Sequence, residues 1–286
     1  MSNATVVSFE DALRARADAE PVVLDPARLK SHQQKVDFST CHAAINRVTV
    51  IKKLKTREIT VFHDFSVAIP KGRKIIILGH RDSGKDTILN LIQRKLLPNR
   101  GKVWVNSRIS WPIPMARFFD MKSTVRENAL FFARIIGMNP KQLIDTLLDF
   151  CEIDPKILKE PLKNMPEWAR KRFGLLLLLY CDFDLHLVKQ QFRPEALKLD
   201  GPNAEKVNEL VYGGDYLATA DQVKSIPSNA NLACVLYEGL LYQFEDVSEA
   251  VEVFEALPKP KEGPARAKDE DDEDFDDDEY AGETVF

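Results

Sequence analysis

A glycine-rich segment that follows a run of β-branched residues constrains the fold of this chain more than any other feature. Residues 79–85 match the pattern G-x-x-x-x-G-K, and residues 74–78 are a lysine, three isoleucines and a leucine, typical of a buried strand. Residues 87–97 then place apolar side chains at helical spacing until Pro98. Strand, glycine loop and helix in this order predict a phosphate-binding unit, because backbone N–H groups and the helix N-terminus can surround phosphate oxygens.

The predicted nucleotide-binding residues come from this loop and the start of its helix. They are Gly79, His80, Arg81, Asp82, Ser83, Gly84, Lys85, Asp86 and Thr87. The lysine is the residue expected to reach the β and γ oxygens. The next position, where a Ser or Thr usually holds Mg²⁺, is an aspartate, so the sequence leaves Mg²⁺ binding open.

The rest of the folded chain alternates strand and helix patterns. Helical patterns begin after Thr124, Asn139 and Pro166, and a last one covers 247–257. Strand patterns cover 48–51, 59–62, 65–69, 185–188, 216–219 and 233–237. We therefore expect an α/β domain at 46–258, with a mainly parallel sheet, additional antiparallel strands and an inserted helical subdomain near 115–175.

The two ends of the chain differ from this domain. Residues 1–45 have no strong alternation and are assigned to an N-terminal extension. Residues 269–286 hold eleven carboxylates and no Lys or Arg, so 259–286 is predicted to be a disordered acidic tail. The remainder, with all 40 basic side chains against 33 of the 44 acidic ones, is mildly basic.

Composition excludes several classes. The four cysteines are scattered without a C-x-x-C pair, which argues against a disulfide framework and a thiolate zinc site and fits a reducing compartment. His63 and His80 lack a third ligand at zinc spacing, and His42 beside Cys41 is isolated, so no metal site is predicted from them. The longest apolar run in the second half, 175–179, is far too short to cross a bilayer, and the polar start lacks a basic segment before an apolar one. We expect a soluble protein that is not secreted by that route.

Three segments outside the glycine loop identify a family resemblance. Residues 61–72, the S-W-P of 110–112, and 126–137 with their R-E-N and A-R-I-x-G resemble the ATP-binding subunits of the ABC transporter superfamily, nearest to those that export capsular and related polysaccharides. The resemblance covers about residues 47–257 and implies an ABC-ATPase-like P-loop fold. It also implies a membrane permease as partner, docked around residues 112–135, a homodimer or a heterodimer with a second ATP-binding subunit, and a place on the cytoplasmic face of the membrane. No nucleic-acid partner is expected.

Several positions that this family uses for nucleotide chemistry carry other residues here. The stacking aromatic falls on Leu54, the middle loop glycine on Asp82, the Mg²⁺ hydroxyl on Asp86 and the loop glutamine on Asp120. Each replacement removes a contact to the base, the phosphates or the metal. A carboxylate about 5 Å from a phosphate charge would cost about 3 kcal/mol at an effective dielectric of 20.

The remaining replacements concern hydrolysis itself. The signature motif falls on residues 165–169, where Pro166 and Trp168 stand without serine or glycine. The metal-binding aspartate and catalytic glutamate fall on Lys189 and Gln190, and the switch histidine near Ala220. Because a lysine cannot bind a metal and a glutamine is no base, the resemblance implies weak ATP binding without a catalytic residue.

These residues leave three hypotheses. The chain is a catalytically degenerate ABC subunit with a structural or regulatory role, or a working ATPase of the same transporter. A third hypothesis, from another class, is a nucleotide-monophosphate kinase, since G-x-x-x-S-G-K-D-T also resembles the phosphate loop of some deoxynucleotide kinases. The S-W-P and R-E-N segments weigh against the kinase.

Overall fold

The computed structural model describes residues 38–53, 58–114, 118–189, 192 and 197–258. Leu54, Gln190, most of the predicted extension and the whole acidic tail lie outside these residues. The chain divides into a unit of Met1–Ala256 and a second of Leu257–Phe286, and the elements below belong to the first. None of the described helices is both long and apolar enough to span a membrane.

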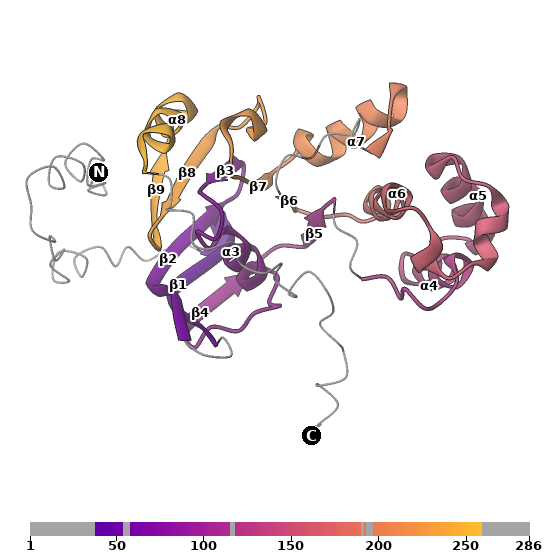
Figure 1. Ribbon diagram of the computed structural model, residues 1–286, viewed down its shortest axis with the longest axis horizontal. Coiled ribbons are helices and arrows are strands. Elements are labelled where there is room, and N and C mark those ends of the chain that lie inside the picture. The colour runs from indigo at the N-terminus through magenta and orange to yellow at the C-terminus, as the bar shows by residue number, and fades with distance from the viewer. Residues whose placement is uncertain (1–37, 54–57, 115–117, 190–191, 193–196, 259–286) are drawn as a thin grey trace, which may run out of the picture. The chain divides into compact units, whose positions relative to one another are not determined.

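Two long strands and a shorter one form an antiparallel sheet in the order β2-β1-β4 (Figure 1). They are β1 (Cys41–Lys53), β2 (Glu58–Pro70) and β4 (Arg100–Val105). The predicted end of the extension at residue 45 falls inside β1, whose first residues are buried because they pair with both neighbours. The strands predicted at 59–62 and 65–69 are one strand, in which Asp64 adopts a left-handed conformation at φ 52°.

The second sheet has six strands in the order β5-β6-β7-β3-β8-β9. All neighbours are parallel except β8 and β9. The strands are β3 (Lys74–Leu78), β5 (Ile109–Ile113), β6 (Leu185–Lys189), β7 (Tyr216–Ala220), β8 (Leu232–Tyr237) and β9 (Leu240–Phe244). The predicted α/β class with a parallel core and additional antiparallel strands is confirmed.

Six α-helices complete the described part. They are α3 (Lys85–Ile92), α4 (Val125–Ile135), α5 (Pro140–Cys151), α6 (Glu167–Leu178), α7 (Gly201–Gly213) and α8 (Val247–Ala256). Helix α5 packs against α4 and α6, which makes the inserted helical subdomain (Figure 1). Helix α3 ends earlier than the predicted residue 97, because the chain turns at Arg94, which has φ 59°.

A single hydrophobic core connects α3 to both sheets. Ile88, Leu91 and Ile92 of α3 are buried in one cluster with Ile75 and Ile77 of β3 and with residues of β1 and β2. Helix α3, which follows the glycine loop, therefore packs against residues of both sheets. This packing fixes the position at which the loop presents its N–H groups.

The four cysteines are free thiols, and Cys41, Cys151 and Cys234 are buried. Burial raises the pKa of Cys151 and of Cys234 to about 12. These thiols are therefore protonated at neutral pH and behave as small apolar side chains.

The helix predicted after Thr124 is α4, and it begins with a capping box. The Thr124 hydroxyl accepts a hydrogen bond from the N–H of Glu127, and the Glu127 carboxylate accepts one from the N–H of Thr124. Replacing Thr124→Ala should lower the free energy of unfolding by about 1 kcal/mol, because an N–H in the first turn loses its acceptor.

Urea unfolding of the purified chain measures this loss. Thr146→Ala is the matched control, since its hydroxyl only donates to the Gln142 carbonyl inside α5. Equal effects of the two substitutions would contradict a specific capping role for Thr124.

Candidate phosphate-binding site

Both glycines of the G-x-x-x-x-G-K pattern occupy positions that exclude a side chain. A Cβ on Gly79 would lie 2.5 Å from Ser83 Oγ, and one on Gly84 would lie 2.8 Å from Phe62 Cζ. Gly84 also has φ +104° and stands at the N-cap of α3. The loop thus needs glycine at these two positions, for space at the first and for space and backbone conformation at the second.

The loop leaves the end of β3 and is tied to the neighbouring strand β7. The N–H of Gly79 donates to the Ala220 carbonyl at 3.1 Å. Ala220, near which the family resemblance predicted the switch histidine, is fully buried at the end of β7. Its methyl group offers no polar contact, so the residue supports the loop through its backbone alone.

Lys85 is folded over the loop. Its ammonium donates to the carbonyls of Gly79 at 2.6 Å and His80 at 2.7 Å, and to Ser83 Oγ at 3.4 Å. Desolvation by burial lowers its pKa, while the carboxylates of Asp221, Asp86 and Asp82 act in the opposite direction. The charged lysine therefore has three acidic neighbours in this site.

Asp86 and Lys189 form an ion pair beside the loop, with 2.8 Å between Oδ2 and Nζ. Asp86 lies in the first turn of α3 and Lys189 ends β6. P-loop NTPases hold Mg²⁺ with a hydroxyl and a carboxylate from the corresponding places, after the loop lysine and at a strand end. Here the two side chains instead bind each other.

These residues do not fit a divalent cation. Among the described residues there is no group of three or more His, Cys, Asp or Glu side chains that could hold a metal ion. A divalent cation about 4 Å from the Lys189 ammonium would be repelled by about 8 kcal/mol at an effective dielectric of 20. The Asp86 carboxylate is engaged with the same ammonium.

The other predicted nucleotide-binding residues differ in how far their side chains are exposed to solvent. Arg81, Asp82 and Asp86 are exposed, whereas Thr87 is 3% exposed on the core side of α3. Asp82 adopts a left-handed conformation, with φ 62°. The ring of His80 packs against Phe254 of α8, with 5.0 Å between the centroids.

Two of the histidines considered above as metal ligands, His42 and His63, are not part of the glycine loop. His42 bonds Asp215 Oδ2 and Ser107 Oγ, each at 2.8 Å, and so connects β1 to the residue before β7. His63 is exposed on β2. His42 thus has a structural role in joining the two sheets.

Asp120, at the glutamine-loop position, takes part in a turn before α4. Its carboxylate accepts hydrogen bonds from the Ser123 hydroxyl and from the Lys122 N–H. These bonds lower its pKa, the Ser123 hydroxyl most strongly. The side chain shapes the local backbone and is charged at neutral pH.

Residues 165–169, to which the family resemblance assigned the signature motif, lead into and begin α6. Pro166 is its N-cap, and the Pro166 carbonyl accepts hydrogen bonds from the N–H groups of Ala169 and Arg170. Glu167 in the first turn pairs with Lys171, and Trp168 packs against the cations of Arg172 and Lys198. A phosphate at this helix start would meet the Glu167 carboxylate.

The tertiary structure brings together groups that the sequence analysis treated separately. In the parallel sheet Leu78 pairs with Ala220 and Lys189 pairs with Thr219, so the residues after β3, β6 and β7 meet at one edge. Asp221, which the sequence analysis did not select, thereby becomes a neighbour of Lys85. The signal that could have found it is its place directly after a predicted strand.

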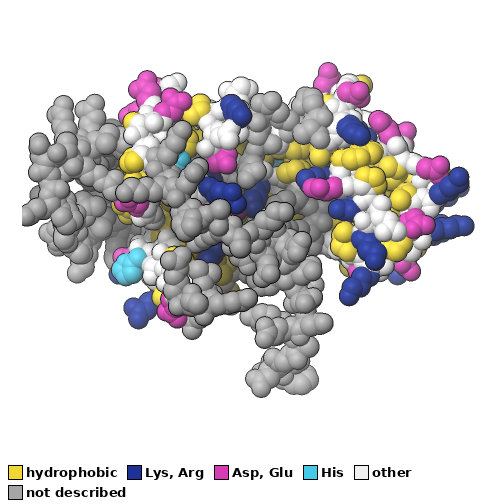
Figure 2. All heavy atoms as spheres, viewed as in Figure 1, with side chains coloured by type: hydrophobic (Ala, Val, Ile, Leu, Met, Phe, Trp, Pro, Cys, Tyr) yellow, Lys and Arg dark blue, Asp and Glu magenta, His cyan; other side chains and the backbone are white. Residues whose placement is uncertain are grey.

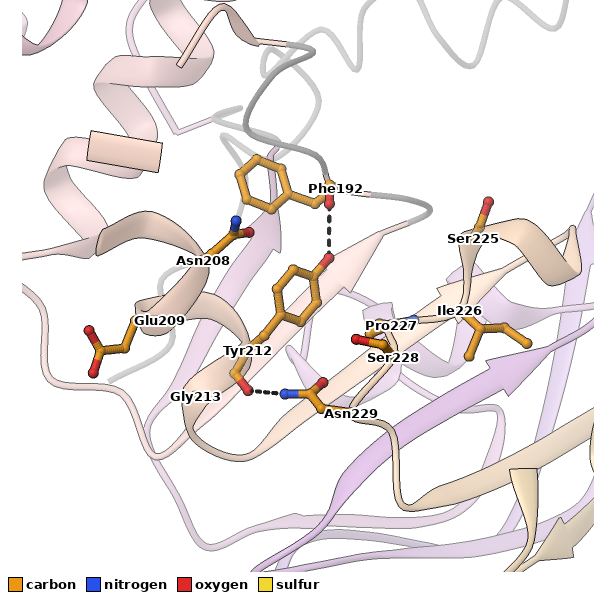
Figure 3. A pocket seen from close by; sticks show the side chains of 10 residues that line it. All are labelled: Phe192, Asn208, Glu209, Tyr212, Gly213, Ser225, Ile226, Pro227, Ser228 and Asn229. Atoms are coloured by element: carbon orange, nitrogen blue, oxygen red, sulfur yellow. Dashed lines mark hydrogen bonds between the residues drawn. The ribbon is translucent and has the colours of Figure 1, made fainter. Parts of the chain in front are cut away.

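A separate cavity of about 480 Å³ lies between α7 and the segment 225–229 (Figure 3). Two of its polar side chains, Tyr212 and Asn229, form hydrogen bonds within the protein. The Tyr212 hydroxyl donates to the Phe192 carbonyl, and the Asn229 amide donates to the Tyr212 carbonyl. No residue of the glycine loop lines it.

No family model matches the chain. The capsule polysaccharide export ATP-binding protein CtrD of Neisseria meningitidis is 28% identical over 211 residues, which are 73% of this chain and 97% of that protein. The polysialic acid transport ATP-binding protein KpsT of Escherichia coli is 25% identical over 73% of this chain and 95% of its own length. The ATP-binding protein BexA of Haemophilus influenzae is 24% identical over 70% and 92%.

Solved structures show the same fold. A dimeric ATP-binding cassette bound to ADP and phosphate matches with a TM-score of 0.52 and 16% identity, over 71% of this chain and 98% of that one. A bacterial Atm1-family ABC exporter with ATP bound matches with a TM-score of 0.54 and 15% identity, over 77% and 43%. The described part of the chain has the ATP-binding cassette fold. None of the relatives and structures named here is a nucleotide kinase.

Proposed function

We propose that the chain is the ATP-binding-cassette subunit of a polysaccharide exporter, bound to a permease on the cytoplasmic face of the membrane, and that it does not hydrolyse ATP. The names of CtrD and KpsT support the transport role. The Asp86–Lys189 ion pair supports the proposed absence of hydrolysis, because it occupies both positions from which such a fold holds Mg²⁺.

The replaced residues favour a structural or regulatory role. Hydrolysis needs a cation that neutralises developing charge and a group that orients the attacking water. Lys189 cannot hold the Mg²⁺ that P-loop NTPases use for the first task, and it does not orient water. The following position, Gln190, is outside the described residues and is no base. The alternative of an active ATPase would require a second, intact subunit to complete a composite site with Gly84 and Lys85.

An exposed apolar surface on the helical subdomain is a candidate contact with the permease. Phe131 is 57% exposed and Ile135 61% exposed, one turn apart on α4, and Met121 precedes the same helix. Figure 2 shows hydrophobic side chains at the surface, among charged ones, over the region that Figure 1 labels α4 to α6. Such a surface is typical of protein contacts.

Aromatic packing keeps this surface in place. The rings of Phe118 and Phe132 lie 5.2 Å apart, and Phe119 stacks on Phe173 of α6 at 4.6 Å. Phe132 thus points into the helical subdomain, while Phe131 is exposed. The cluster explains why substitutions at the exposed residues should leave the fold intact.

Membrane association tests the transport role. The chain, coexpressed with a polysaccharide-export permease from the same genome, should copurify with the membrane fraction. The variant Phe131→Ser with Ile135→Ser should reduce the copurified amount at least about tenfold, as expected for the loss of two buried anchors. A crosslink from Met121→Cys to the permease would support the same surface.

Leu97→Ser is the matched control, because Leu97 is a similarly exposed apolar residue outside the helical subdomain. It should copurify like the unmodified chain. A chain that stays wholly out of the membrane fraction, with no permease in the pull-down, would contradict the proposed function.

A further inference from the structure

We propose that the ammonium of Lys189 replaces the divalent cation in this site, so that the loop binds a nucleoside triphosphate as the metal-free anion. The inference rests on the proposed function, because it assumes that the glycine loop still receives phosphate groups. It goes further by naming the form of the nucleotide and the residue that substitutes for the metal.

The first argument is position. Lys189 is the last residue of β6 and pairs in register with Thr219 of β7, and its ammonium is held 2.8 Å from Asp86 in the first turn of α3. The ammonium is thus fixed between a strand end and the start of the loop helix. In this fold the metal ion is bound by residues from those two places.

The second argument is charge. Lys189 is close enough to Lys85 to influence its protonation, so two ammonium groups flank the loop. Pairing with Lys189 also offsets the Asp86 carboxylate, which would otherwise face the phosphate oxygens. A metal-bound triphosphate would instead bring a second cation toward an ammonium.

The third argument is that the lysine end of the ion pair is shielded from water, although the Asp86 side chain is exposed. The Lys189 side chain is less than one third exposed, and an ammonium has three donors, of which Asp86 uses one. A lysine in this situation acts as a point charge for phosphate, as the loop lysine does.

Calorimetric titration of the purified chain with ATP tests the inference, once in excess EDTA and once in excess MgCl₂. We expect the dissociation constant in EDTA to be equal to, or lower than, that in Mg²⁺. Lys189→Met should weaken binding in EDTA about tenfold, because the charge is lost and Asp86 then faces the phosphates.

The double variant Asp86→Ser with Lys189→Asp restores a hydroxyl and a carboxylate at the two metal positions. Its binding should become at least about tenfold tighter in Mg²⁺ than in EDTA. Lys171→Met is the matched control, since it removes the Glu167–Lys171 ion pair on α6 and should leave binding unchanged in both conditions. Thermal midpoints confirm that each variant is folded.

Three results would overturn the inference. They are binding by the unmodified chain that is tenfold tighter in Mg²⁺, no binding in EDTA at about 5 mM ATP, and equal Mg²⁺ dependence of the double variant and the unmodified chain. The proposed function fails separately, through ATP turnover or loss of permease binding. Mg²⁺-dependent binding without phosphate release would therefore contradict only the inference.

Discussion

Phosphate release by the purified chain in Mg²⁺ and ATP should be indistinguishable from that of its Lys85→Ala variant. The group that would orient the attacking water falls on Gln190, and the signature serine that would close on the γ-phosphate is absent from residues 165–169. Each loss is expected to lower the rate about a hundredfold, so their product is about ten thousandfold.

Nucleotide affinity should be low for related reasons. Asp82 and Asp221 place carboxylates near Lys85, and the position of the stacking aromatic falls on Leu54, outside the described residues. We expect a dissociation constant no tighter than roughly the high micromolar range.

A coupled assay of phosphate release at saturating ATP measures turnover. Comparison with the Lys85→Ala variant separates phosphate release by this chain from release by contaminating ATPases, because only turnover at this loop depends on that lysine. A Lys85-dependent rate of about one per second, an ordinary value for an enzyme, would restore the active-ATPase hypothesis.

Arg172→Leu should destabilise the chain by about 3 kcal/mol or more. The guanidinium is fully buried and donates to the carbonyls of Leu197 at 2.7 Å and Phe150 at 3.2 Å, and also to that of Lys198. The substitution leaves these acceptors without a partner in a water-poor environment, which costs more than the bonds contribute when intact.

The free energy of unfolding in urea measures this effect. Arg134→Leu is the matched control, because Arg134 is exposed on α4 and should change stability by less than about 0.5 kcal/mol. Arg172→Lys should recover little, since an ammonium cannot supply the planar fork of donors. A loss below about 1 kcal/mol for Arg172→Leu would mean that the three carbonyls find other donors.

The role of Arg172 was not evident from the sequence. Arg170, Lys171 and Arg172 form one basic cluster in the chain, and nothing in their order separates them. In the helix they point in different directions, so Lys171 pairs with Glu167 at the surface while Arg172 is buried. Helical geometry explains why the three side chains point in different directions. Only the packing of α6 against its neighbours decides which of the three is buried.

Local signals predicted many element positions. The β-branched run of β3, the capping residues Thr124 and Asn139, and Pro166 before α6 each act within a few residues of their own position. The elements β4, β5, β9 and α7 were not predicted. Strand pairing and burial against distant segments decide such elements, and short apolar runs do not reveal them.

The sequence predicted the glycine loop, because the backbone angle of Gly84 and the close approach of Ser83 to Gly79 are local constraints. The lack of space beside Gly84, where a Cβ would meet Phe62 of β2, comes from the tertiary structure. The family resemblance in the sequence also predicted that Asp86 and Lys189 replace the expected metal-binding residues. That the two replacements form one ion pair depends on the parallel order of β6, β7 and β3, which places residues 86 and 189 at the same sheet edge. Such a contact between distant residues follows from the topology alone, since no local interaction links them.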